Sequence, residues 1–343
     1  MSRGWRYGAV GVMAAGASLA AAGLAGAAEV NIYSYRQEAL IKPQLEAFKK
    51  ATGISYNLIT GSASGLLQRL KSEGANSPAD VLFTVDAGRL HTAEEMGLLQ
   101  PVRSAVLEKS IPAHLRDPQG RWFGLGMRAR AVFYHVDRVK PAELSTYEDL
   151  ASQKWKGRIL IRSSNNIYNQ SLLASLIHHH GAKKAEEWAR GIVANMARKP
   201  QGGDTDQLRA VFAGEGDIAI SNNYYYARLL ASKKEADRKV TSKVKVFWPN
   251  QDGRGTHVNI SGAGITKSAK NKANAIKLLE FLVGEDAQKI YAEVGHEFPV
   301  RQGVPRGDIV AGMGAFKMDS IPLEVLGRNN AEAVRIFDRV GWR

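Results

Sequence analysis

Two long runs suited to extended backbone decide the fold of this chain: GLGMRARAVFYHV at residues 124–136 and THVNISGAGITKSA at residues 256–269. Both are much longer than an ordinary strand of roughly five or six residues. The segment between them repeats strand-like and helix-like patterns of its own. We therefore expect an α/β protein with two lobes, joined by two crossing strands, and with a ligand cleft between the lobes.

The segments around these runs predict α/β layers. EVNIYSY (29–35), SYNLIT (55–60) and ADVLFTV (79–85) have the composition of strands, and the stretches between them carry apolar residues at helical spacing. In the central segment, GRILIRS (157–163) and GDIAIS (216–221) also predict strands. Alternation of this kind is typical of a mainly parallel sheet, which we expect here.

The same pattern suggests how the chain is divided. We expect a signal peptide at residues 1–28, a first lobe from 29–127 plus 255–303, and a second lobe from 128–254 plus 304–343. The chain has no cysteine, so its stability must come from packed cores rather than from disulfides.

The N-terminus has the pattern of a secretory signal peptide. Arg3 and Arg6 precede a long uncharged run of small and apolar residues that ends in an Ala-rich stretch. A stop-transfer helix is the alternative, but the run is unusually rich in Gly and Ala. Cleavage is expected after Ala27 or Ala28, which would release a soluble protein into the periplasm.

The charge balance gives a weaker signal. The formal net charge is +14, and removal of Arg3 and Arg6 leaves +12 (14 − 2). A positive net charge of this size could favour nucleic acid or an anionic surface as a binding partner, but the Lys and Arg residues are scattered and form no long block. We therefore expect no nucleic-acid partner, and we expect a monomer.

Three consecutive tyrosines stand in ISNNYYYARLL, residues 220–230, where a predicted strand meets a predicted helix. Asn222 or Asn223 suits the N-cap, which would place Tyr224 and Tyr225 in the first helical turn. This is the end of a strand at which α/β sheets hold ligands. RSSNNIYNQSLL, residues 162–173, has the same design with Tyr168. If both helix starts face the cleft, three phenol oxygens converge there.

Such a site suits a hard trivalent cation. Phenols have a pKa near 10, so phenolates at neutral pH require a strong positive field, which Fe(III) would supply. Arg36, Arg128 and Arg130 lie on or beside the extended segments and are candidates to hold an accompanying anion in bidentate fashion. The alternative is that the tyrosines pack in a core and that the arginines pair with carboxylates such as Asp86 or Asp204.

Motifs of enzymes are not found in the sequence. There is no HExxH, GxSxG, Walker or dinucleotide-binding fingerprint, and the lack of cysteine excludes a thiol nucleophile. The run His178–His180 cannot chelate one ion, because consecutive residues of a helix point to different sides. We therefore expect a binding protein and not an enzyme.

A set of ordered stretches along the chain together carries a resemblance to a known family. They include VNIYSYRQ (30–37), SPADVLFTVD (77–86), WFGLGMRARAVFY (122–134), IRSSNNIYN (161–169), SNNYYYARLL (221–230) and GHEFPVRQGV (295–304). In these stretches the chain resembles the periplasmic ferric-iron-binding proteins of bacterial ABC iron transporters. The resemblance implies the type II periplasmic binding protein fold, with Fe(III) bound by Tyr168, Tyr224 and Tyr225 together with carbonate or a similar synergistic anion. It also implies Arg36 and Arg128, rather than Arg130, as the anion-holding pair, and delivery of iron to an inner-membrane ABC permease with its ATPase.

The chain departs from that family at three positions. Many relatives have histidine where this chain has Gln37, some have tyrosine at the position of Glu38, and one branch has glutamate at that of Val85. Gln37 and Val85 are poor ferric ligands, so we expect little direct coordination from the first lobe. Glu38 and Gln37 remain the candidates there for additional metal ligands.

Two rival functions follow from the same residues. One is a binding protein of this fold for another solute, such as thiamine, a polyamine or an inorganic anion. The other is an exported enzyme that uses a cleft tyrosine as a nucleophile or general acid.

Overall fold

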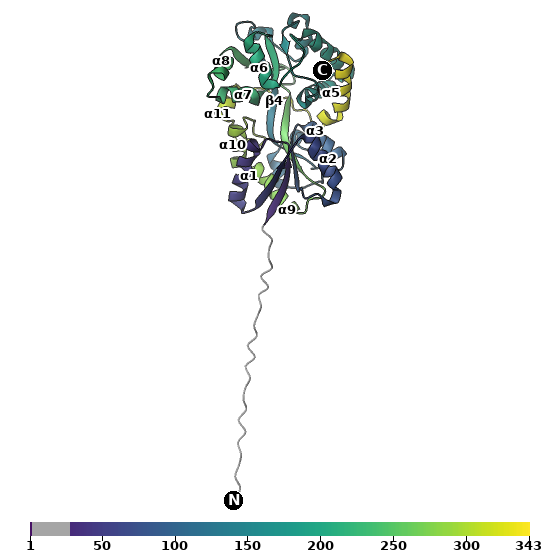
Figure 1. The fold of residues 1–343 in the computed structure, drawn as a ribbon, viewed down its shortest axis with the longest axis vertical. Coiled ribbons are helices and arrows are strands. Elements are labelled where there is room, and N and C mark those ends of the chain that lie inside the picture. The colour runs from purple at the N-terminus through teal and green to yellow at the C-terminus, as the bar shows by residue number, and fades with distance from the viewer. Residues whose placement is uncertain (2–27) are drawn as a thin grey trace.

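The computed structural model describes residue 1 and residues 28–343, so nearly all of the predicted signal peptide lies outside the described residues. Figure 1 shows two groups of helices along the long axis, with α6, α7 and α8 in one group and α1, α2 and α9 in the other. The long strand β4 (Phe123–His135) runs from one group to the other. No helix in the described part of the chain is both long and apolar enough to span a membrane.

The group that contains the N-terminal strands confirms the strands predicted there. Strand β1 lies between β2 and β3 and is parallel to both. Gly53 ends α1 in the left-handed conformation (φ 71°), which glycine adopts readily at the end of a helix. The elements of this group are β1 (Glu29–Ser34), α1 (Glu38–Thr52), β2 (Ser55–Thr60), α2 (Ala63–Glu73), β3 (Val81–Val85), α3 (Ala87–Glu95), α4 (Ala105–Ser110), α9 (Lys272–Leu282) and α10 (Glu285–Val294).

The central segment forms the second group. Its strand β5 is shorter than predicted, because only Ile159 and Leu160 pair with β6, and the chain then turns away toward α5. Helix α5 contains a break at Gly181 (φ 80°), next to the histidine run. The elements are β5 (Ile159–Leu160), α5 (Ile167–Asn195), α6 (Asp204–Ala213), β6 (Ile218–Asn222), α7 (Asn223–Ala231), α8 (Glu235–Lys243) and β7 (Val244–Phe247).

The two long runs form β4 and β8 (Val258–Ile265), which pair with each other at the centre of the sheet. Residues of β4 up to Ala129 pair with β8, and those from Arg130 onward pair with β6. This change of partner falls beside the predicted lobe boundary at residues 127 and 128; the full division of the chain stays a prediction.

The expected mainly parallel sheet was wrong. Strand β8 is antiparallel to both β3 and β4, and β4 is antiparallel to β6 and β7. The reason is the two crossings: one strand leaves the first group and the other returns to it, so they run in opposite directions. Parallel pairing remains within the β1–β2, β1–β3 and β5–β6 pairs.

Tyr147 ties the two strands together where they cross. Its buried hydroxyl donates a hydrogen bond to the carbonyl oxygen of Arg130 on β4, and it accepts one from the backbone N–H of His257, just before β8, at 3.1 Å. The first half of β4 differs, because a β-bulge at Leu125 shifts the register between Gly124 and Gly126.

The C-terminal segment contacts both groups. Helix α12 (Glu324–Arg328) packs against α3 and α5, and α13 (Asn330–Val340) packs against α5. The short helix α11 (Asp308–Ala311) lies against α7.

Two helix starts in the second group are capped differently. Thr146 Oγ1 accepts from the backbone N–H of Asp149, at the start of a single 3₁₀ turn. Asn222 occupies the N-cap of α7, as predicted, but its side chain makes no capping hydrogen bond, because its Oδ1 accepts from Arg130 instead.

Candidate functional site

The tyrosines lie at two neighbouring helix starts. Tyr224 and Tyr225 are in the first turn of α7, directly after β6, and Tyr168 is in the first turn of α5. The hydroxyl of Tyr224 donates a hydrogen bond to the hydroxyl of Tyr168 at 3.1 Å. The fold therefore brings together two phenol oxygens from positions 56 residues apart in the sequence.

All three tyrosines line one cavity of about 260 Å³, which we call the tyrosine cavity. The rings of Tyr224 and Tyr225 lie with their centroids 4.3 Å apart, so the two neighbours point to the same side of the helix tip. The third member of the run, Tyr226, is buried elsewhere and donates to the carbonyl oxygen of Val244 at 2.8 Å. The residues that line the tyrosine cavity are Tyr35, Arg36, Gln37, Leu40, Val85, Arg128, Tyr168, Tyr224, Tyr225, Arg228 and Glu297.

Without a cation, the buried phenols strongly favour their neutral forms. Burial raises the pKa of Tyr224 well above 10.0, and the nearby phenols of Tyr168 and Tyr225 raise it further. Burial also raises the pKa of Tyr168, against the opposing effect of the Arg128 cation. Deprotonation of these groups at neutral pH thus requires a positive charge stronger than that of the protein's own arginines.

Arg36 and Arg128 also line the tyrosine cavity, and they share one hydroxyl. Ser261 Oγ accepts from Nη1 of Arg36 at 2.7 Å and from Nη1 of Arg128 at 2.8 Å. Nη1 of Arg36 also donates to Glu297 Oε1 at 2.7 Å. Burial alone would lower the pKa of Arg36, but the Glu297 carboxylate raises it, so this guanidinium stays charged.

Arg128 retains unused hydrogen-bonding capacity. Its Nε and Nη2 atoms are buried and have no hydrogen-bond partner among residues 28–343. Together these two atoms form one edge of the guanidinium, the geometry that binds two oxygens of a carboxylate or carbonate. Arg128 is thus able to hold a planar oxyanion inside the tyrosine cavity.

Arg130 is placed differently. Its Nη1 donates to Asp204 Oδ1 at 3.3 Å and to Asn222 Oδ1 at 3.0 Å, and its Nη2 donates to Asn169 Oδ1 at 2.6 Å. It does not line the tyrosine cavity. The structure therefore brings Arg36 and Arg128 to the site and gives Arg130 a set of buried protein partners.

The two further candidates for metal ligands are also separated. Gln37 lines the tyrosine cavity, as does Val85. Glu38 does not; its side chain is exposed and pairs with Lys42 at 3.4 Å, one turn along α1.

Two charged residues of the cavity were missed in the sequence. Arg228 lies with its guanidinium carbon 5.1 Å from the ring centroid of Tyr224 and 5.7 Å from that of Tyr225. Its position four residues after Tyr224 on a predicted helix was the signal for this contact. Glu297 is buried, and it directly precedes the apolar residues Phe298, Pro299 and Val300. An acid beside apolar residues was the only local sign in the sequence that this charge could be buried at a site.

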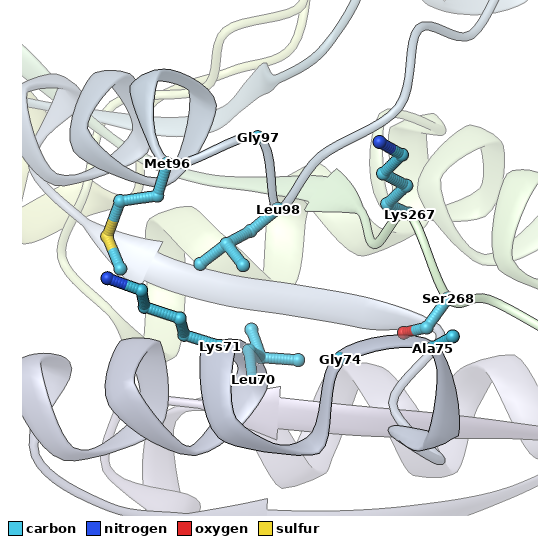
Figure 2. Close-up of a pocket in the computed structure, with 9 residues that line it drawn as sticks. All are labelled: Leu70, Lys71, Gly74, Ala75, Met96, Gly97, Leu98, Lys267 and Ser268. Atoms are coloured by element: carbon cyan, nitrogen blue, oxygen red, sulfur yellow. The ribbon is translucent and has the colours of Figure 1, made fainter.

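Two other groups of residues in the described part of the chain differ from this site. His179 pairs with Asp319 at 2.7 Å and His180 with Glu148 at 2.8 Å, so these histidines point to different partners, as predicted. A hollow of about 610 Å³ lies near the ends of α2 and α3 and contains no tyrosine. Figure 2 shows its apolar side chains, among them Leu70, together with two lysines.

Comparison with known proteins places the chain among binding proteins. The family model for bacterial extracellular solute-binding proteins matches residues 76–308. Iron uptake protein A1 of Synechocystis is 51% identical over 315 residues, which cover 92% of this chain and 88% of that protein.

Solved structures give the same result. A Trichodesmium protein named IdiA or FutA, in complex with iron and citrate ligands, has a TM-score of 0.90 and 54% identity, covering 92% of this chain and all of that one (100%). The ferric iron-binding protein A of Mannheimia haemolytica, in an open conformation, has a TM-score of 0.86 and 46% identity, covering 92% of this chain and 99% of that one. The chain therefore belongs to the bacterial extracellular solute-binding proteins, in the group that includes the ferric-iron-binding proteins, and it has the bilobal type II periplasmic binding protein fold.

Proposed function

We propose that this protein is the periplasmic binding component of an ABC iron transporter and that it binds Fe(III) through the phenolates of Tyr168, Tyr224 and Tyr225. The observation that supports this proposal is the meeting of the three phenols in one cavity, with the oxygens of Tyr168 and Tyr224 3.1 Å apart. Its relatives named for iron uptake and for iron complexes support the choice of metal.

The chemistry follows from charge. Three phenolates carry three negative charges, which neutralise Fe(III) and leave no net charge to attract the hydroxide that precipitates ferric ion. Tyr168 and Tyr224 must lose their protons as iron enters, because burial disfavours their phenolates in the iron-free cavity. Iron binding is therefore coupled to proton release.

A synergistic anion completes the proposed site. Arg128 lines the same cavity as the phenols, and its free Nε and Nη2 atoms can hold carbonate or a similar planar oxyanion in bidentate fashion. The anion would then fill positions on the metal that Gln37 and Val85 cannot supply.

Delivery requires the cleft to open. The two groups of elements are joined by β4 and β8, and rigid-body movement about such strands opens and closes a cleft between lobes. We propose that the iron-loaded closed form, as a monomer, is the form recognised by an inner-membrane permease with its ATPase. In this role the protein carries iron and catalyses no reaction.

The visible spectrum tests this function. The mature protein is stripped of metal, given ferric citrate, and compared with a Tyr224→Phe, Tyr225→Phe double variant and with Tyr226→Phe as the matched control. We expect a phenolate-to-iron band in the wild type and in Tyr226→Phe, and none in the double variant. A wild type that takes up no iron, but whose melting temperature rises with thiamine, a polyamine or an inorganic anion, would support the rival binding function. Turnover of a substrate by the metal-free protein, lost in Tyr168→Phe, would indicate an enzyme.

A further inference from the structure

Glu297 is the single carboxylate among the residues that line the tyrosine cavity, and it sits in the part of the site where an anion is expected. Its Oε1 accepts from Arg36 Nη1 at 2.7 Å and from Ser261 Oγ at 3.1 Å. The same Ser261 oxygen accepts from Arg128 at 2.8 Å. Glu297 is thus hydrogen-bonded directly to one arginine of the site and through a single hydroxyl to the other.

The position of this carboxylate is fixed by close packing. A side chain at Gly126 would overlap Glu297 Oε2, and a Cβ at Gly295 would lie 2.9 Å from Arg36 Nη2. The next residue, Phe298, exchanges two backbone hydrogen bonds with Met127 on β4, at 2.6 and 2.8 Å. The Arg36–Glu297 pair is therefore held between backbone segments, and Arg36 cannot leave Glu297 without a rearrangement.

The Glu297 carboxylate lowers the net positive charge that the cavity offers to an anion. The residues that line the cavity include three cations (Arg36, Arg128 and Arg228) and one carboxylate (Glu297), which gives a net charge of +2 (3 − 1). Fe(III) with three phenolates adds nothing to this sum. A dianion therefore brings the filled site to neutrality, whereas a trianion leaves one negative charge in a buried place, which is unfavourable.

We propose that Glu297 determines which class of anion the site accepts, by limiting it to doubly charged oxyanions. Glu297 neutralises Arg36 and occupies its Nη1, so that the free edge of Arg128 is the main bidentate donor for the anion. This inference rests on the proposed iron-binding function, because it concerns the anion of that same site.

The test is the substitution Glu297→Gln, which removes the charge and keeps the size and an acceptor oxygen. The iron-free protein is titrated with sulfate, a dianion, and with citrate, a trianion, by calorimetry. We expect citrate binding to strengthen relative to sulfate binding by about tenfold or more, since the cavity gains one net positive charge within a few ångströms of the ligand. Glu293→Gln, an exposed carboxylate of the same region, is the matched control and should leave the ratio of the two dissociation constants unchanged.

A second variant guards against failure of Glu297→Gln to fold. Arg228→Gln lowers the net charge of the cavity from +2 to +1 (2 − 1) at a half-buried position, and it should weaken citrate relative to sulfate by about tenfold.

An unchanged ratio in either variant, or a wild type that binds citrate as tightly as sulfate, overturns the inference. The ferric band of the wild type is recorded on the same preparation. If that band is absent, the proposed function fails; if it is present and the ratio does not change, only the role of Glu297 is wrong.

Discussion

The residues that line the tyrosine cavity fall into two sets with different chemistry. The first set, the tyrosine wall, consists of the three phenols carried by α5 and α7, and burial keeps Tyr168 and Tyr224 neutral until a metal arrives. The second set contains Arg36 and Arg128, together with Gln37 and Val85, which are poor ferric ligands. In the proposed function the first set supplies donors for the cation and the second supplies charge for its anion, so the two can be tested separately.

The largest effect is expected at the tyrosine wall. Tyr168→Phe removes one phenolate and leaves the ferric charge incompletely neutralised, so the visible band and stable iron retention should both be lost. Glu38→Gln is the comparison on the other side, because Glu38 is exposed and lies outside the cavity lining. It should change iron affinity by less than about twofold. A large loss in Glu38→Gln would mean that α1 contributes a ligand after all.

The pH dependence should be steep and should arise from the tyrosine wall. Burial raises the pKa of Tyr168 and Tyr224, so these phenols are protonated in the iron-free protein and each releases a proton when iron binds. Iron affinity should therefore fall as pH falls, by about tenfold per released proton for each pH unit. Competition with a chelator of known proton affinity measures this. A flat profile between about pH 8 and 6 would contradict phenolate coordination.

Two arginines on the same strand sharpen the comparison further. Arg130→Gln leaves the fully buried Asp204 without its nearest cation, so the free energy of unfolding should fall by about 3 kcal/mol. Arg128→Gln removes an edge that no protein group in the described chain uses, so it should weaken iron retention by about 10- to 100-fold with less loss of stability. Denaturant unfolding and chelator competition on both variants separate the two roles. The interpretation fails if Arg130→Gln affects iron and Arg128→Gln affects only folding.

The smallest effect concerns closure of the cleft. Ser171, on α5 three residues after Tyr168, donates to Asp86 Oδ1 at 2.7 Å, and Asp86 caps α3 beyond β3. Ser171→Ala should weaken this contact by about 1 kcal/mol and shift the iron-free protein toward a more open form in solution scattering. Ser175→Ala is the matched control, because Ser175 bonds only within α5. Equal dimensions for the two variants would show that the contact does not favour closure.

Much of the fold could be predicted because it depends on local patterns. Long extended runs predicted β4 and β8, and strand–helix alternation predicted the flanking layers. The direction of the pairing could not be predicted in the same way, since it depends on how strands far apart in the sequence meet. Short β5 illustrates this: its apolar run continues past Leu160 to Ile161, but its pairing with β6 stops at Leu160.

The candidate site was predictable to a similar extent. The strand ends predicted two helix starts with the three tyrosines in their first turns, and these three tyrosines line one cavity. Local sequence patterns did not separate the roles of Arg128 and Arg130, because both are buried on one strand and differ in distant partners such as Asp204. Only the resemblance to the ferric-iron-binding proteins favoured Arg128. The contact between Arg36 and Glu297 joins residues 261 positions apart, which no local pattern reveals.

The two ends of the β4–β8 pairing differ in a way that has a mechanical consequence. At one end, beside Arg130, the Tyr147 hydroxyl links β4 to the chain entering β8, while at the other end a bulge interrupts the pairing between Gly124 and Gly126. A pair of strands that is held by hydrogen bonds at one end and irregularly paired at the other bends more easily near the irregular end. The hinge for lobe motion is therefore expected on the Gly124 side of the β4–β8 pairing. Helices α5 and α7 would then move together as one rigid body, and their phenols would keep the same relative positions while the cleft opens and closes.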